Sequence, residues 1–401
     1  MILRPYLDLF KTPGVAGFAL AGLLARMPLS MTGIGLITML SQLRGAYTLA
    51  GAVAATFALC MALLAPQVSR LVDRHGQSRV LPLAAGVSVL ALAALLACTR
   101  LGAPDWTLFL FAALAGCMPS MPAMVRARWT LLYRGRPQLQ TAFALEAILD
   151  DVAFIAGPPI SVGLSVAVFP EAGPLAALLL LALGVAVFVS QRATEPPVNA
   201  DAHRHAGGSV MRLPGLRALV LVMLGMGVIV GTVDVGSVAF ATRQGNPADA
   251  SIVLSVYAAG SFIAGLVFGA LRLSAPLHCM LMLAGAATAL TTLPLLLAAS
   301  VLTLAMAVFV AGMSFAPTIT VAMGLVEHLV PPARLTEGMT WLLTGLGVGV
   351  ALGAALAGWA VDGWGVRAGF VVSAAAAALV FASAALASRL LQPQSAFTQS
   401  A

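Results

Sequence analysis

The chain has 401 residues, of which 61 % are hydrophobic and only 9 % are charged. A soluble domain carries about 25 % charged residues, so this chain cannot cover its surface against water, and a soluble fold is excluded. The formal net charge of +7 does not indicate nucleic-acid binding, because no basic stripe with interleaved aromatic residues lies outside the apolar stretches.

Apolar stretches of roughly 20 residues, the length that a transmembrane helix needs, follow one another along almost the whole sequence. Only helices and closed barrels satisfy their backbone groups inside a bilayer, and these runs are too long and too uniformly apolar for barrel strands. We therefore predict an all-α membrane protein with twelve transmembrane helices. The predicted spans are 15–40, 47–66, 80–98, 106–125, 141–169, 174–191, 216–240, 250–271, 278–298, 301–326, 339–361 and 368–390.

The two halves of the sequence resemble each other. Ala115 and Gly116 correspond to Ala311 and Gly312 at a separation of 196 residues, and both pairs lie in a Gly/Pro-interrupted span. Parallel repeats of six helices are typical of transporters, with the substrate site between the repeats near the middle of the membrane. We predict two six-helix bundles, 1–191 and 215–401, joined by a polar cytoplasmic linker over 192–214.

The basic residues predict the orientation. Most of the 21 lysines and arginines fall in the connections on the same side as the N-terminus, so the positive-inside rule places both termini in the cytoplasm. The first apolar stretch is too long for a secretory signal, whose apolar region spans roughly 7–15 residues. The predicted location is a bacterial-type inner (plasma) membrane, crossed many times by the chain.

The segment 69–79, between the second and third predicted spans, has the sequence Ser-Arg-Leu-Val-Asp-Arg-His-Gly-Gln-Ser-Arg. It resembles the loop motif of the major facilitator superfamily, Gly-x-x-x-Asp-Arg-x-Gly-Arg-Arg. Asp73, Arg74 and Gly76 match this motif, and Arg79 supplies a positive charge slightly late. The departures are Ser69, Gln77 and Ser78. The resemblance implies a drug- or metabolite-exporter-like transporter in which these charges form a cytoplasmic gate, and Gly76 permits a tight reversal between two helices.

The fifth predicted span contains Gly157-Pro158-Pro159-Ile160-Ser161-Val162-Gly163. This segment resembles the Gly-Pro-x-x-Gly-Gly motif of superfamily members that export substrates against protons. Proline kinks a helix because it removes a backbone donor, so Gly157 and Pro158 are predicted to form a hinge. The resemblance favours export.

Charged residues inside the spans are the candidate site. They are costly in a membrane and usually face a cavity or a partner. Arg26 lies about 17 Å along the first span, and Asp150 and Asp151 lie about 14–15 Å along the fifth, at 1.5 Å per residue. Glu146 is four residues before Asp150 and shares its helix face. These residues are therefore predicted to meet as a site for substrate binding and proton coupling.

One arginine among three carboxylates leaves surplus negative charge, so one acid is expected to hold a proton near neutral pH. The alternative is a static buried ion pair that fixes helix packing. Asp234, near the far end of the seventh span, is a second candidate for a titrating or gating residue, with a solvated helix end as the alternative. Glu327 and Glu337 flank a predicted cytoplasmic loop and are expected to be solvated.

These features predict a secondary transporter, not an enzyme, which exports a small organic solute in exchange for protons by alternating access. The alternatives are uptake or facilitated diffusion of a metabolite, and a membrane scaffold or sensor that does not transport. The four cysteines and five histidines lack metal-ligand spacing. We expect no cofactor, no metal, no nucleic acid and no obligatory protein partner; the expected partners are the solute, protons and the lipid bilayer.

Overall fold

The computed structural model describes residues 4–44, 47–198, 209–244, 249–271 and 275–391. Over these ranges the chain is helical and contains no strand. It divides into two compact units, which comprise the described parts of 1–207 with 332–340 and of 208–331 with 341–401. Part of the predicted linker, residues 199–208, lies outside the described residues.

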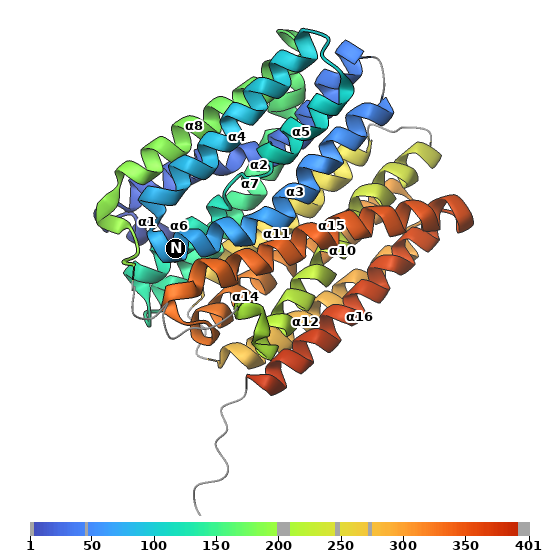
Figure 1. Cartoon of the computed structure of the whole chain (residues 1–401). Helices are drawn as coiled ribbons and strands as arrows, with labels where there is room; N and C mark the ends of the chain where they lie inside the picture. Colours follow the sequence, from blue (N-terminus) through green and yellow to red (C-terminus); the bar gives the residue numbers. More distant parts are fainter. Residues whose placement is uncertain (1–3, 45–46, 199–208, 245–248, 272–274, 392–401) are drawn as a thin grey trace, which may run out of the picture. The chain divides into compact units, whose positions relative to one another are not determined.

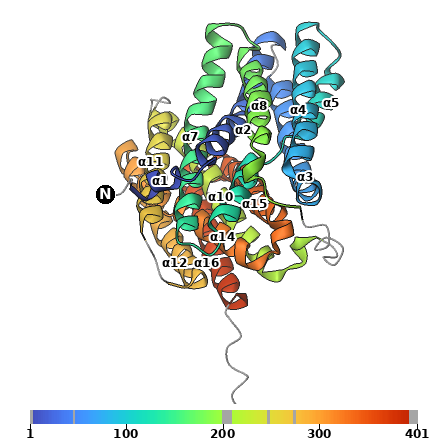
Figure 2. The same cartoon turned by 90° about the vertical axis from the view of Figure 1, so that its left-hand side faces the viewer.

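The first unit contains the helices of the N-terminal half of the chain, coloured blue to green in Figure 1. Helix α2 packs lengthwise against both α7 and α8 (Figure 2), and α4 packs against α5 and α8. The helices are α1 (Arg4–Leu9), α2 (Val15–Arg44), α3 (Tyr47–His75), α4 (Gln77–Arg100), α5 (Asp105–Ala115), α6 (Met121–Tyr133), α7 (Gln138–Ala167) and α8 (Ala172–Ser190), followed by the short η1 (Arg192–Thr194).

The second unit begins at the short η2 (Val210–Arg212), and in it α16 packs against both α10 and α12. The helices after η2 are α10 (Pro214–Arg243), α11 (Asp249–Ala270), α12 (Leu277–Thr292) with η3 (Leu293–Leu297), α13 (Val301–Gly312), α14 (Phe315–Leu329), α15 (Leu335–Trp364) and α16 (Val366–Leu390). The short η4 (Pro332–Arg334) and the first residues of α15 group with the first unit.

Eleven of the predicted spans correspond to helical segments long and apolar enough to cross a membrane, and one of these segments, Val301–Leu329, comprises α13 and α14. The remaining prediction, 106–125, is divided between α5 and α6, and α5 alone is only 11 residues long. The break is at Gly116–Ser120, where Pro119 and Pro122 flank Ser120 and interrupt backbone hydrogen bonding. The span is therefore present as two helices rather than one.

Large apolar side chains lie on the outside of these helices. On α4, Leu83 and Leu90 are more than 70 % exposed, whereas Leu81 and Leu92 on its other side are fully buried. Such an apolar outer surface is unfavourable in water and suits the hydrocarbon of a bilayer. The distribution is the one predicted for a membrane protein.

The internal repeat is visible in the packing of each unit. Gly116, at the end of α5, faces Met61 of α3, and a Cβ on it would lie 2.7 Å from the Met61 backbone nitrogen. In the second unit, Gly312 ends α13 and contacts the backbone of Tyr257 on α11 in the same way. Both pairs are related by the same separation of 196 residues. Glycine is needed at both positions because a side chain would push the neighbouring helix away.

Candidate functional site

A buried charge cluster lies where α2, α6 and α7 of the first unit meet. Arg26 of α2 is 2 % exposed and Glu146 of α7 is completely buried. The Arg26 Nη2 atom forms an ion pair with Glu146, and its Nη1 donates to Asp150 Oδ1 at 2.9 Å. Arg26 therefore lies beside two of the three predicted acids, Glu146 and Asp150, as the depths of these residues along their spans predict.

Two further members of the cluster come from α6. Arg126 is completely buried, and its Nη2 donates to Asp150 Oδ2 at 2.7 Å. Trp129, also completely buried, donates from Nε1 to Glu146 Oε1 at 2.9 Å. They are three positions apart in the sequence, so they share a face of α6. Each carboxylate of the cluster is therefore held by one residue of α2 and one of α6.

Sequence reasoning missed Arg126 and Trp129. Arg126 directly follows the fourth predicted span, 106–125, where an arginine is expected to lie in a connection and to set orientation. The overlooked signal was its position directly after an apolar run, with Arg128 and Trp129 close behind. An ionisable residue inside a transmembrane segment usually faces a partner or a cavity, and the helix continues past Arg126 to Trp129, Leu131 and Leu132.

The second arginine changes the charge balance. Arg26 and Arg126 together match Glu146 and Asp150 in formal charge, so these four side chains carry no surplus negative charge. Asp151, the third predicted acid, is partly exposed and points to a different side of α7, because successive helical residues are about 100° apart. Asp234 lies on α10 of the second unit, is partly exposed, and is not a member of this cluster.

Helices α2 and α7 approach each other closely one turn beyond the cluster. Ser30 Oγ donates to the Ala153 carbonyl at 2.7 Å, and Ser161 Oγ donates to the Met31 carbonyl at 3.0 Å. Gly157 faces Ser30, and a Cβ at this position would collide with the Ser30 hydroxyl. Helix α7 continues through Pro158. The predicted hinge residues thus lie in a continuous helix, at a point where Gly157 permits close packing.

The predicted gate motif is not a loop but the end of α3, the reversal and the start of α4. Gly76 separates α3 from α4 with φ of 92°, in the left-handed region that favours glycine. Asp73 Oδ2 accepts from the backbone nitrogen of Glu337 at 2.8 Å, and Arg70 Nε donates to Glu337 Oε1 at 2.7 Å. Asp73 therefore caps the first turn of α15, where a negative charge is favoured.

Two expectations for this region are corrected. Glu337 is only 2 % exposed and Glu327 only 4 %, so neither is solvated. Glu337 is covered because the first turn of α15 packs against the end of α3, a contact that charge and hydropathy along the chain do not reveal. The arginine that contacts Glu337 is Arg70, whereas Arg74 and Arg79 are exposed.

The departure of Gln77 from the motif has a structural reason. Gln77 is buried, and its Oε1 accepts from Arg128 Nε at 2.8 Å while its Nε2 donates to the Met124 carbonyl. Arg128 thus brings the positive charge from α6 to the position where the motif has a basic residue. Its remaining nitrogens donate to the Phe188 and Gln191 carbonyls and to Thr194 Oγ1, and its guanidinium lies 3.8 Å from the centre of the Phe188 ring.

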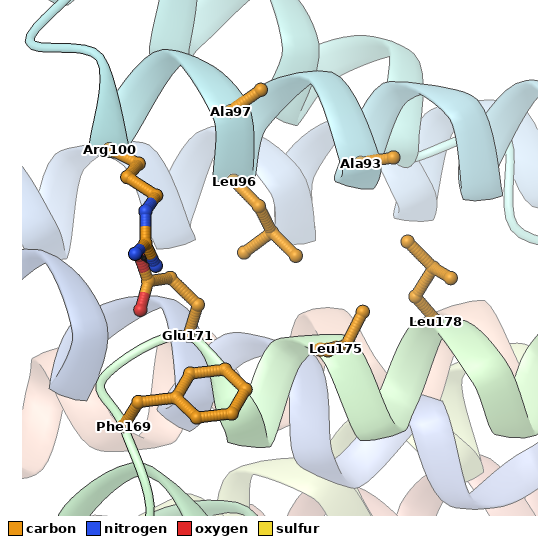
Figure 3. A pocket seen from close by; sticks show the side chains of 8 residues that line it. All are labelled: Ala93, Leu96, Ala97, Arg100, Phe169, Glu171, Leu175 and Leu178. Atoms are coloured by element: carbon orange, nitrogen blue, oxygen red, sulfur yellow. Dashed lines mark hydrogen bonds and ion pairs between the residues drawn. The ribbon is translucent and has the colours of Figure 1, made fainter.

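An apolar groove of about 340 Å³ lies on the first unit between α4 and α8 and contains none of the predicted site residues (Figure 3). Arg100 and Glu171 meet at one end of it, 3.4 Å apart. The rest of its lining is apolar, namely Ala93, Leu96, Ala97, Phe169, Leu175 and Leu178. The groove suits a hydrocarbon chain better than a polar solute.

The sequence matches a family model, and this match agrees with the helical repeat, the motif and the buried charge cluster. The model of the Major Facilitator Superfamily matches residues 18–245 and 218–400, which together span nearly the whole chain. The chain belongs to the major facilitator superfamily. Membership indicates that this facilitator is a multi-pass membrane transporter rather than an enzyme.

Solved structures of transporters share the fold of this facilitator. It resembles the human organic anion transporter MFSD10, with 15 % identity, a TM-score of 0.73, and coverage of 92 % of this chain and 98 % of that one. A bacterial homologue of the iron transporter ferroportin has 15 % identity, a TM-score of 0.71, and coverage of 94 % and 99 %. The E. coli fucose:proton symporter has 14 % identity, a TM-score of 0.68, and coverage of 92 % and 98 %. No protein of curated function matches the chain in sequence.

Proposed function

We propose that this facilitator exports a small organic solute in a proton-coupled cycle of alternating access. The observation that supports this most is the buried cluster of Arg26, Arg126, Glu146 and Asp150 in the first unit. Charged side chains are costly inside a membrane and are typical of ion and substrate pathways. A carboxylate shared between arginines on two helices can change partners when the helices move.

Asp150 is the residue best suited to proton coupling. Its side chain is 17 % exposed, whereas those of Arg26, Arg126 and Glu146 are at most 1 % exposed. A proton can therefore reach Asp150 more readily than Glu146. Protonation would weaken both of its ion pairs at once, which would couple the proton to the packing of α2 and α6 against α7.

The other predicted sites have separate roles in this proposal. Two six-helix halves, 1–191 and 215–401, rock about the linker 192–214, with both termini in the cytoplasm of a bacterial-type inner membrane. The motif residues Asp73, Arg74, Gly76 and Arg79 form the cytoplasmic gate together with Arg70, and its contacts to the first turn of α15 come from Asp73 and Arg70. Gly157 and Pro158 let α7 adjust beside α2, Asp151 belongs to the substrate and proton-coupling site, and Asp234 is a second titrating residue.

The direction of transport rests on the partial export motif at Gly157 and Pro158. The fold does not select a solute, because the similar structures are named for different cargoes: an organic anion transporter, a homologue of an iron transporter and a proton symporter of fucose. The presence of a proton symporter among them is compatible with proton coupling.

One observation favours a second function, an uncoupled carrier with a structural charge cluster. The two arginines and two carboxylates balance in charge, as expected for a static network that fixes helix packing. Such a carrier would catalyse uptake or facilitated diffusion, and its transport would not respond to a pH gradient.

A pH-gradient assay separates the two functions. Purified protein is reconstituted into vesicles with an internal pH-sensitive dye, and labelled solutes are added to inside-acid, inside-alkaline and gradient-free vesicles. A proton-coupled exporter accumulates its solute in inside-acid vesicles while protons leave. Equal uptake under all three conditions would support the uncoupled carrier, and absence of any solute movement would favour a scaffold or sensor.

A further inference from the structure

Three arginines of α2 and α6, namely Arg26, Arg126 and Arg128, are at most 2 % exposed, and they differ in how their donors are satisfied. Arg26 donates from Nε to the Gly22 carbonyl and from its two Nη atoms to Glu146 and Asp150. Every guanidinium nitrogen of Arg128 also has an acceptor on a side chain or backbone carbonyl. These two residues show that the unit can satisfy a buried guanidinium fully.

Arg126 is the exception. Its Nη2 donates to Asp150, but Nε and Nη1 are buried and have no hydrogen-bond partner among the described residues. Buried polar groups are nearly always hydrogen-bonded, and an unsatisfied donor on a charged group is especially unfavourable. Two such donors on one side chain, beside a carboxylate that is partly accessible, indicate that an acceptor from outside the chain completes the site.

We propose that Arg126 binds a carboxylate of the transported solute, so that the substrate class is small organic carboxylates. The inference rests on the proposed transport function and specifies its solute. A guanidinium binds planar carboxylates with directed, charge-assisted hydrogen bonds. Asp150 already holds one side of Arg126 in this manner, and the solute carboxylate takes the donors that Asp150 leaves unused.

The same contacts disfavour a cationic solute at this position. Both carboxylates of the cluster are already held by arginines, with Glu146 additionally bound to Trp129. A cation would have to displace a buried guanidinium, whereas an anion satisfies donors that are unpaired. The chemistry of the cluster therefore selects for negative charge.

The first test compares carboxylates with their neutral amides. The thermal stability of the purified protein is measured with benzoate and glutarate, and with benzamide and glutaramide, at constant ionic strength. The proposal predicts that at least one carboxylate raises the melting temperature by several degrees while its amide does not. Stabilisation by no carboxylate, or equal stabilisation by a carboxylate and its amide, would overturn it.

Two arginine variants locate the effect. Arg126→Gln is expected to abolish the stabilisation by the carboxylate. Arg100→Gln, which changes an exposed arginine at the outer groove, serves as the matched control and is expected to retain it. An effect that persists in Arg126→Gln, or is lost in Arg100→Gln, would contradict the assignment.

Misfolding of Arg126→Gln would also abolish binding, so a second variant with a predicted gain of affinity is measured. In Asp150→Asn, the Nη2 atom of Arg126 no longer donates to a charged carboxylate of the protein. The solute carboxylate should therefore bind about tenfold more tightly. A purely structural Arg126–Asp150 pair predicts unchanged or weaker binding. Affinity that is unchanged or reduced in folded Asp150→Asn would therefore overturn the proposal.

Measuring proton flux in vesicles tests the carboxylate substrate class separately from proton-coupled transport. Solute-driven proton movement with neutral solutes, unaffected by Arg126→Gln, would reject the substrate class and leave proton-coupled transport intact. Carboxylate binding that depends on Arg126, without any proton movement, would support the binding site and reject the coupling.

Discussion

Arg126 and Asp150 form an ion pair of 2.7 Å in which the guanidinium is fully buried and the carboxylate is partly exposed. The pair joins α6 to α7, and the other oxygen of Asp150 joins α7 to Arg26 on α2. One carboxylate therefore links three helices of the first unit. A change in its protonation or its partners would reach all three helices together.

Trp129 fixes the second carboxylate of the cluster, and its removal has a defined effect. Trp129→Phe removes the Nε1 donor and leaves Glu146 Oε1, which is completely buried, without this hydrogen bond. We expect a loss of about 1–3 kcal/mol in stability, measured by thermal unfolding in detergent. Trp106→Phe is the control, because Trp106 is 65 % exposed; an equal effect of both variants would contradict the role of the hydrogen bond.

Gly157 is expected to be intolerant of a side chain because Ser30 lies directly against it. Gly157→Ala should destabilise the protein by about 1–3 kcal/mol through overpacking. Gly163→Ala on the same helix is the matched control, since a Cβ there meets nothing within 4 Å. Ser30→Ala should relieve part of the effect of Gly157→Ala. Thermal unfolding of the three single variants and the double variant checks this, and strict additivity would contradict direct contact.

Gln77 stands where the superfamily motif has a basic residue, and Arg128 supplies the positive charge there. Swapping these two residues is therefore predicted to recover stability that is lost when only Gln77 is replaced. Gln77→Arg restores the basic residue of the superfamily motif but places it against the buried guanidinium of Arg128, so stability should fall. Adding Arg128→Gln should recover at least half of the loss, because it inverts the pair. Arg79→Gln, at an exposed position, should have no effect. A double variant less stable than either single variant would reject the exchange.

The contact between α3 and α15 depends on Arg70 rather than on the arginine that the motif predicts. Arg70→Ala removes the ion pair with buried Glu337 and should cost about 1–3 kcal/mol, whereas Arg74→Ala, at an exposed position, should be neutral. Thermal unfolding of the two variants provides the comparison. If Arg74→Ala destabilises the protein more than Arg70→Ala does, the contact depends on Arg74, as the motif predicts.

The spans and the level at which Arg26 meets Glu146 and Asp150 could be predicted, because hydropathy and helical rise are properties of consecutive residues. Arg126 and Glu337 could not be placed in this way. Both lie at the ends of apolar segments, where a charge is ordinarily solvated, and both are buried by contacts with residues distant in the sequence. The site was therefore predicted from α2 and α7 but lacked its contribution from α6.

The most direct test of proton coupling is solute-driven proton flux through Asp150→Asn in reconstituted vesicles. The solute is the carboxylate that stabilises the wild-type protein most, and Asp8→Asn, at an exposed position of α1, is the matched control. We predict that Asp150→Asn folds, inserts and binds the carboxylate but shows no solute-driven proton movement, while Asp8→Asn behaves as wild type. Normal proton movement through Asp150→Asn would contradict the assignment of Asp150 as the coupling residue.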